Sequence, residues 1–193
     1  MKIYKFILLF FVLSTAFGYS QDKMHEVRVS YGIGTTSEMI DAFSDILMSG
    51  LSGKKYTKNT NYSGAIILDY KYKLNKRVRL GGTFTYEKSD AKAYSDKAYV
   101  GKFNRNYYTI AAEADFNYFS SKYVDIYGSL GLGGTLYHEK YTSEDNEKDN
   151  NEIFHMNFQV TPIGVKLGKN IGAFAELGVG YKGIISTGAF ARF

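Results

Sequence analysis

The chain has 193 residues, a formal net charge of +5, 45% hydrophobic residues and no cysteine. This length predicts one domain, and the lack of cysteine excludes disulfide bonds, thiol chemistry and a lipid-modified N-terminal cysteine. The basic residues form no dense cluster with interleaved aromatic residues, which argues against nucleic-acid binding.

The first twenty residues have the pattern of a secretory signal peptide: a basic start, an apolar run at residues 7–13 and small residues before the cleavage point. The apolar run is shorter than the ~20 residues that a membrane-spanning helix needs. We expect cleavage after Gly18 or Ser20, with residues 1–20 as the signal peptide and 21–193 as one mature domain. Losing the segment's two lysines would lower the net charge from +5 to +3.

Apolar residues then recur at every second position in eight segments, which predicts β-strands with one apolar and one polar face. In the sixth, the apolar positions shift by one residue at Thr161-Pro162, which predicts a β-bulge that also tolerates the proline. The eight strands are expected at residues 24–35, 62–74, 78–88, 106–118, 123–137, from about 153 to 167, 171–181 and 184–193.

Long and short connections between these strands alternate. Short turns are expected at 75–77, 119–122, 168–170 and 182–183, and long polar loops at 36–61, 89–105 and 138–152. Transmembrane barrels have short periplasmic turns and longer extracellular loops. The predicted fold is therefore all-β: an eight-stranded antiparallel up-and-down transmembrane β-barrel with both termini in the periplasm.

The two faces of the strands predict lipid outside and a filled lumen inside. Opposite charges are nearly balanced on the inward face, as burial requires, and an eight-stranded barrel is just wide enough for side chains to fill. A soluble barrel or sandwich would bury the apolar face instead. The expected aromatic girdles contain Tyr31, Tyr62, Tyr72, Tyr86, Tyr108, Tyr118 and Phe193. The expected inward charges are Glu26, Arg28, Asp69, Lys71, Lys73, Arg79, Glu87, Glu113, Asp115, Asp125, Glu176 and Arg192, beside the aromatic residues Tyr127, Tyr137, Phe174 and Phe190.

The first loop has helical spacing of apolar residues over 37–51, with Thr36 or Ser37 as the N-cap and Gly50 at the end. We expect a short helix over the barrel mouth; an amphipathic segment that touches lipid or admits a hydrophobic solute is the alternative. The third loop, 139–152, is acidic but lacks the spacing of a calcium loop, so a solvated charge run is expected.

His138 and His155 flank the third loop and, with Glu139, could suggest zinc or a catalytic base. No nucleophile spacing supports catalysis. The run from Gly131 to Gly134 lies within a strand and is interpreted as room for bulky neighbouring side chains rather than as a phosphate loop. No catalytic, cofactor-binding or metal-binding residue is predicted.

The mature chain resembles the small outer-membrane β-barrels of Gram-negative bacteria, both the OmpA/OmpX-like and the OmpW-like porin-family barrels. The resemblance rests on the strand pattern and on residues 178–185, followed by a strand that closes on Ala191-Arg192-Phe193. It implies an outer-membrane location and recognition of Phe193 by the outer-membrane assembly machinery. The residues that alternate before Phe193 and match the spacing of this recognition signal are Ile185, Thr187, Ala189 and Ala191.

These features predict a non-catalytic surface protein with a role in envelope integrity or adhesion, exerted through its long loops. Its expected partners are outer-membrane lipids, lipopolysaccharide, the assembly machinery and an extracellular ligand, and we expect a monomer without a cofactor. A narrow porin, or an OmpW-like conduit for small or hydrophobic solutes, is the alternative. A lipid A-modifying outer-membrane enzyme is a remote one.

Overall fold

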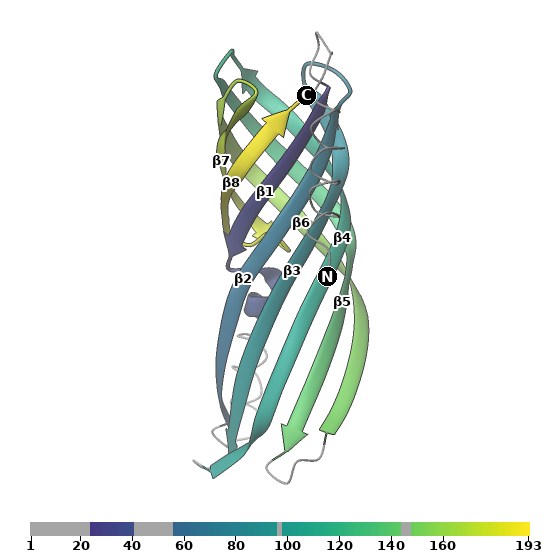
Figure 1. Cartoon of the computed structure of the whole chain (residues 1–193), viewed down its shortest axis with the longest axis vertical. Coiled ribbons are helices and arrows are strands. Elements are labelled where there is room, and N and C mark those ends of the chain that lie inside the picture. The colour runs from purple at the N-terminus through teal and green to yellow at the C-terminus, as the bar shows by residue number, and fades with distance from the viewer. Residues whose placement is uncertain (1–23, 41–55, 96–97, 144–147) are drawn as a thin grey trace, which may run out of the picture.

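The computed structural model describes residues 24–40, 56–95, 98–143 and 148–193 (Figure 1). The expected signal peptide, Gly50 and the centre of the acidic third loop lie outside these residues. No helix in the described ranges is long and apolar enough to cross a membrane. The strands are β1 (His25–Ile33), β2 (Tyr56–Lys73), β3 (Val78–Ser95), β4 (Ala98–Ser120), β5 (Val124–Ser143), β6 (Lys148–Gly168), β7 (Ile171–Gly180) and β8 (Ile185–Arg192).

Each strand pairs antiparallel with its neighbours in the sequence, and β1 also pairs with β8, so that the sheet closes into a barrel. At this seam, His25 and Phe193 exchange two backbone hydrogen bonds of 3.0 Å, and their rings stack with centroids 5.6 Å apart. The prediction of an eight-stranded antiparallel up-and-down barrel is confirmed.

The side chains divide as the alternation predicts, with apolar residues outside and charged residues inside. Ile110, near the middle of β4, is 70% exposed, whereas Arg28 and Asp115 on the inside are fully buried. A soluble barrel with an apolar core is therefore excluded. Among the expected girdle residues, Tyr31 and Tyr108 are exposed near the outer ends of the apolar bands of β1 and β4, and Tyr118 is exposed near the opposite end of β4.

β2 to β6 are longer than the sequence predicts. They continue through much of the segments expected to be loops, and these extensions reach beyond β7, β8 and β1 at one end of the barrel (Figure 1). The alternation failed to predict them because their outward face is no longer apolar. On β3 the outward residues after Tyr86 are Lys88, Asp90 and Lys92, and the Lys88 ammonium group lies 3.2 Å from the Asp90 carboxylate.

The register shifts in several strand pairs, and two of these shifts bear on the predictions. The register between β6 and β7 shifts between Val160 and Ile163, which confirms the bulge predicted at Thr161-Pro162. A second shift lies between Tyr62 and Ala65 in β2, where Gly64 has a positive φ of 71°. Because of this unpredicted bulge, Ser63 is exposed rather than inward.

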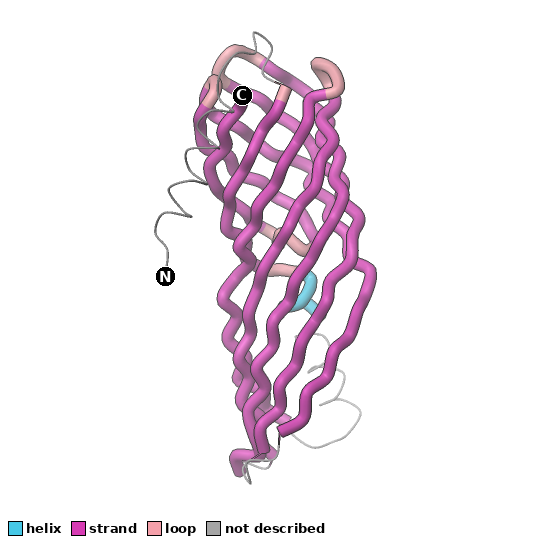
Figure 2. The backbone as a smooth tube through the Cα atoms, turned by 45° about the vertical axis from the view of Figure 1, so that its right-hand side comes forward, coloured by secondary structure: helices cyan, strands magenta, loops and turns pink. Residues whose placement is uncertain are grey.

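The chain after β1 turns into a short helix at residues 36–40, which lies on the inner side of the extended strands (Figure 2). The prediction that Thr36 or Ser37 caps this helix is wrong. Thr35 is the cap: its hydroxyl accepts the Glu38 N–H at 3.3 Å and donates to the Glu87 carboxylate at 2.8 Å. The side-chain oxygen of Thr36 is buried without a hydrogen-bond partner.

Candidate functional site: a closed lumen with a pocket at its mouth

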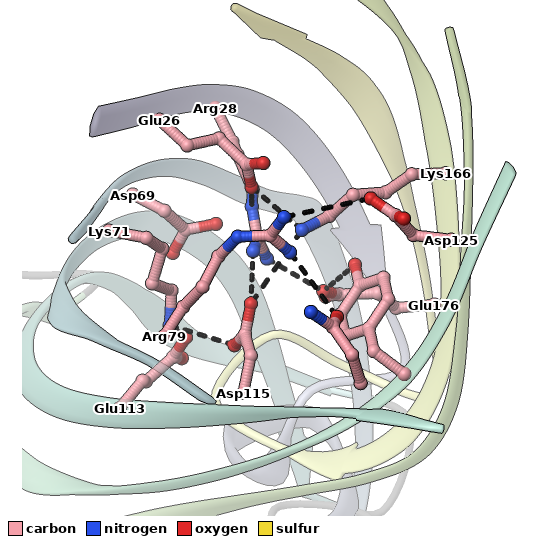
Figure 3. Close-up of polar contacts among 12 residues, drawn as sticks. Glu26, Arg28, Asp69, Lys71, Arg79, Glu113, Asp115, Asp125, Lys166 and Glu176 are labelled. Carbon is pink, nitrogen blue, oxygen red and sulfur yellow. Dashed lines mark hydrogen bonds and ion pairs between the residues drawn. The ribbon is translucent and has the colours of Figure 1, made fainter. Parts of the chain in front are cut away.

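The interior of the barrel contains a network of buried charges, here called the lumen cluster (Figure 3). Its members come from β1, β2, β3, β4, β5, β6, β7, β8 and the β7–β8 turn, and it contains as many basic as acidic groups. The acids are Glu26, Asp69, Glu113, Asp115, Asp125 and Glu176, and the bases are Arg28, Lys71, Arg79, Lys166, Lys182 and Arg192.

Arg28 joins carboxylates from three strands. Its guanidinium group lies 2.5 Å from Glu26, makes a close ion pair with Asp115 and lies 3.4 Å from Glu176. Its carbon Cζ is also 5.2 Å from the centre of the Tyr127 ring. Guanidinium groups suit such sites because their planar fork of N–H donors serves several acceptors at once.

Lysines from three separate elements complete the cluster. Lys166 lies 2.7 Å from Glu26, and Lys71 makes a close ion pair with Glu113 and lies 3.2 Å from Asp115. Each charge therefore has opposite charges beside it, which offsets the desolvation that would otherwise make burial costly.

The turn between β7 and β8 folds into the lumen, where Tyr181 and Lys182 are almost fully buried. The Lys182 ammonium group lies 2.8 Å from Glu113 and 3.0 Å from Asp69, and the Tyr181 hydroxyl donates to Glu113 at 2.6 Å. Gly131 makes room for this turn, since a Cβ atom there would collide with the Tyr181 hydroxyl. The prediction that this glycine-rich run accommodates a bulky neighbour is confirmed at Gly131.

The sequence located most of the lumen cluster. Of the predicted inward charges, Lys73 and Arg192 are partly exposed and the others are buried. Lys166 and Lys182 were missed. Lys166 follows from the bulge, because shifting the inward positions by one residue after Pro162 gives Gly164 and Lys166. Lys182 has no such signal, since a turn has no periodicity from which its direction can be read.

A polar layer separates the cluster from the barrel mouth. The hydroxyl groups of Thr109 and Thr135 are 2.7 Å apart, and the Asn157 amide donates to Thr135 at 3.0 Å. All three side chains are buried. These residues come from the neighbouring strands β4, β5 and β6, so the hydrogen bonds link three strands on one side of the lumen, between the cluster and the mouth.

A pocket of about 370 Å³ lies on the outer side of this layer. The rings of Tyr107 and Tyr137 are stacked there, with centroids 5.2 Å apart. Beside them, Arg105 and Glu139 form an ion pair of 2.7 Å, and the Tyr137 hydroxyl donates to Glu139 at 2.5 Å. Burial and this hydrogen bond raise the pKa of Tyr137 above its usual value.

The histidines do not form the zinc or base site considered from the sequence. His138 lies on the outward face of β5 and its imidazole is 2.9 Å from Glu152, whereas His155 lines the pocket inside. Glu139 is bound to Arg105 instead. Within the described ranges, no group of three or more His, Cys, Asp or Glu residues is arranged to hold a metal ion.

Solved structures of small barrels are similar to this chain. Ail, the attachment invasion locus protein of Yersinia pestis, in complex with the heparin analogue sucrose octasulfate, has 16% identity and a TM-score of 0.46, and the match covers 88% of this chain and 99% of that chain. A second Ail structure has 15% identity and a TM-score of 0.43, with coverage of 88% and 99%. The N-terminal β-barrel domain of Pseudomonas aeruginosa OprF has 16% identity and a TM-score of 0.43, with coverage of 87% and 97%. No protein-family model and no curated protein matches the chain.

Proposed function

We propose that this chain is an outer-membrane β-barrel with a closed lumen that acts at the cell surface as a non-catalytic envelope or adhesion protein. One observation carries the proposal: apolar side chains cover the outside of the barrel while the lumen cluster is buried inside. Soluble monomers rarely expose apolar patches larger than a few hundred Å². A closed barrel in lipid satisfies both its backbone and its apolar exterior.

The height of the apolar band supports a membrane-spanning position. On β4 the outward residues from Tyr108 to Tyr118 are apolar or aromatic, which matches the ~9–11 residues of a tilted transmembrane strand. Beyond Tyr108 the outward residues are Asn106, Asn104 and Lys102. We therefore place the extended hairpins β3–β4 and β5–β6 outside the membrane, where they are available to an extracellular ligand.

The remaining partners belong to the same proposal. Membrane lipids and lipopolysaccharide would contact the outward face, and the assembly machinery would recognise the strand that ends at Phe193. The protein would act as a monomer. The alternative, a narrow porin or a conduit, would require the lumen cluster to rearrange, because its paired charges occupy the interior.

Conductance separates the closed barrel from the porin. Reconstituted in planar bilayers, the protein should give no single-channel currents, and reproducible channels would reject a closed lumen. A lipid A mass spectrum that is unchanged between cells with and without the protein would support the absence of a lipid-modifying activity.

The surface role is tested by shortening one hairpin. Replacing residues 91–103, which join the paired residues Asp90 and Asn104, with a glycine-rich turn should abolish binding of cells that carry the protein to host cells or matrix. Heat-modifiable gel migration should be unchanged, because the apolar band remains. Equal binding by the folded, shortened variant would contradict a role for this hairpin.

A further inference from the structure

The pocket at the barrel mouth has the features of a small-molecule site. Its volume of about 370 Å³ lies within the ~300–1,000 Å³ of typical ligand pockets. The stacked rings of Tyr107 and Tyr137 form one wall, and Ile40 from the short helix and Ile153 from β6 add apolar surface. Such pockets usually combine an apolar lining with a few polar groups that orient the ligand.

Two polar side chains in the lining have unused hydrogen-bonding capacity. Neither the hydroxyl of Ser37 nor the imidazole of His155 makes a side-chain hydrogen bond or ion pair in the described parts of the chain. The neighbouring polar groups differ in this respect, since Arg105, Glu139 and the Tyr137 hydroxyl bind one another. Ser37 and His155 are therefore the groups that remain available to a ligand.

A hydrogen-bonded pair of threonines lies on the lumen side of the pocket. Thr109 and Thr135 follow Tyr107 and Tyr137 on the inward face of β4 and β5, and their hydroxyls bind each other. The lumen cluster lies beyond them. This step rests on the closed lumen proposed above: with such a lumen, a molecule in the pocket can bind but cannot pass through the barrel, which distinguishes the site from a conduit.

The position of the pocket points to an amphiphilic ligand. Tyr108, Leu136 and Phe154, the outward neighbours of its lining residues, are the last apolar residues of the outward band, and His138 and Glu152 follow them. Ile153 points inward. It is nevertheless 44% exposed, because β7 pairs with β6 only as far as Gln159 and does not reach it. The pocket thus lies at the height where lipid gives way to water.

We propose that this pocket binds a single-chain amphiphile with a carboxyl or hydroxyl head. The apolar chain would pack on the tyrosine rings and Ile153, and the head would bond to Ser37 and His155. A strongly cationic head is disfavoured because the described lining residues include no carboxylate, and the neighbouring Glu139 is held by Arg105. This site is independent of any partner of the hairpins.

Dodecanoate and dodecanol serve as probes, with dodecyltrimethylammonium as the cationic comparison. Equilibrium dialysis of radiolabelled probe against the protein in amphipol should show saturable binding of the first two at one site per chain and weaker binding of the third. Equal, non-saturable uptake of all three probes would show that they only partition onto the apolar exterior of the barrel, and it would overturn the proposal. If a fatty acid co-purifies with the protein from membranes, the natural ligand comes from the membrane leaflet. If the pocket fills only when probe is added, the ligand comes from outside the cell.

Matched histidine variants test the head group. His155→Phe keeps an apolar wall and should weaken dodecanoate binding by about 10- to 150-fold, since hydrogen bonds to charged groups contribute about 1.5–3 kcal/mol. His138→Phe, on the outward face of the neighbouring strand β5, should bind dodecanoate as well as the parent protein does. Equal affinity of the two variants would refute the role of His155.

Matched tryptophan variants test the cavity itself. Ile153→Trp should fill the pocket and abolish saturable binding of both probes, while Phe154→Trp, one residue away on the lipid-facing side, should leave binding intact. Both variants should keep heat-modifiable migration and electrical silence in bilayers. Loss of the ligand site therefore remains distinguishable from failure of the closed-barrel proposal. Undiminished binding by Ile153→Trp would show that the pocket is not the site.

Discussion

The ammonium group of Lys182 lies 2.8 Å from the carboxylate of Glu113, although Lys182 belongs to the β7–β8 turn and Glu113 to β4. Both side chains are almost fully buried. This contact holds the turn inside the barrel and joins it to the lumen cluster. It is therefore the first contact to test.

Lys182→Met should lower the free energy of unfolding by about 3–5 kcal/mol, because Glu113 and Asp69 lose a buried counter-charge. Urea unfolding in lipid vesicles, followed by gel migration, measures the change. Lys76→Met, in the exposed turn between β2 and β3, is the control and should shift stability by no more than about 0.5 kcal/mol. Equal stability of the two variants would mean that Lys182 does not stabilise the barrel.

Gly131→Ala should destabilise the protein by about 1–3 kcal/mol, because the added methyl group collides with the Tyr181 hydroxyl inside a packed lumen. Gly82→Ala is the matched substitution on the outward face of the barrel. A Cβ atom at Gly82 would meet only the Ala111 carbonyl oxygen, at an ordinary 3.7 Å. Gly82→Ala should be neutral or slightly stabilising, and the reverse order of stability would contradict the packing described for Tyr181.

Ile110→Lys tests whether lipid contacts the apolar band. Ile110 is exposed near the middle of the outward face of β4, where a lysine in the bilayer should cost about 2–4 kcal/mol. Asn104→Lys, farther along the same face, lies beyond the band and should cost about 0–1 kcal/mol. The difference between their unfolding free energies in vesicles is the measurement, and two small, equal effects would place Ile110 in water.

Thr35→Ala removes the helix cap and the hydrogen bond to Glu87, and should cost about 1 kcal/mol. Hydrogen exchange should show faster exchange of the Met39 amide, which donates to the Thr35 carbonyl at 3.0 Å. Thr36→Ala removes a buried hydroxyl that has no hydrogen-bond partner and should leave this amide protected. Faster exchange of the Met39 amide in Thr36→Ala than in Thr35→Ala would support Thr36 as the helix cap, as predicted from the sequence.

The sequence predicts the parts of the fold in which the two faces of a strand lie in different environments. Where one face of a strand is apolar and points outward and the other is polar and faces the lumen, alternation assigns residues such as Arg28 and Ile110 to the correct sides. The contrast disappears beyond Tyr86, where both faces of β3 are polar, and the strand extensions were missed there. The pocket was also out of reach, because Ser37 and His155 meet only through the closure of the barrel.

Glu26 and Arg192 are 166 positions apart, yet their side chains lie 2.7 Å from each other across the β1–β8 seam. Contacts of such sequence separation form late and make folding slow, because the chain between them must be ordered first. We expect these charges to stay hydrated until β8 reaches β1. We expect the contacts of Arg192 with Glu26 and Asp125 to form only at that point, so they stabilise the finished barrel without guiding the order in which the strands assemble.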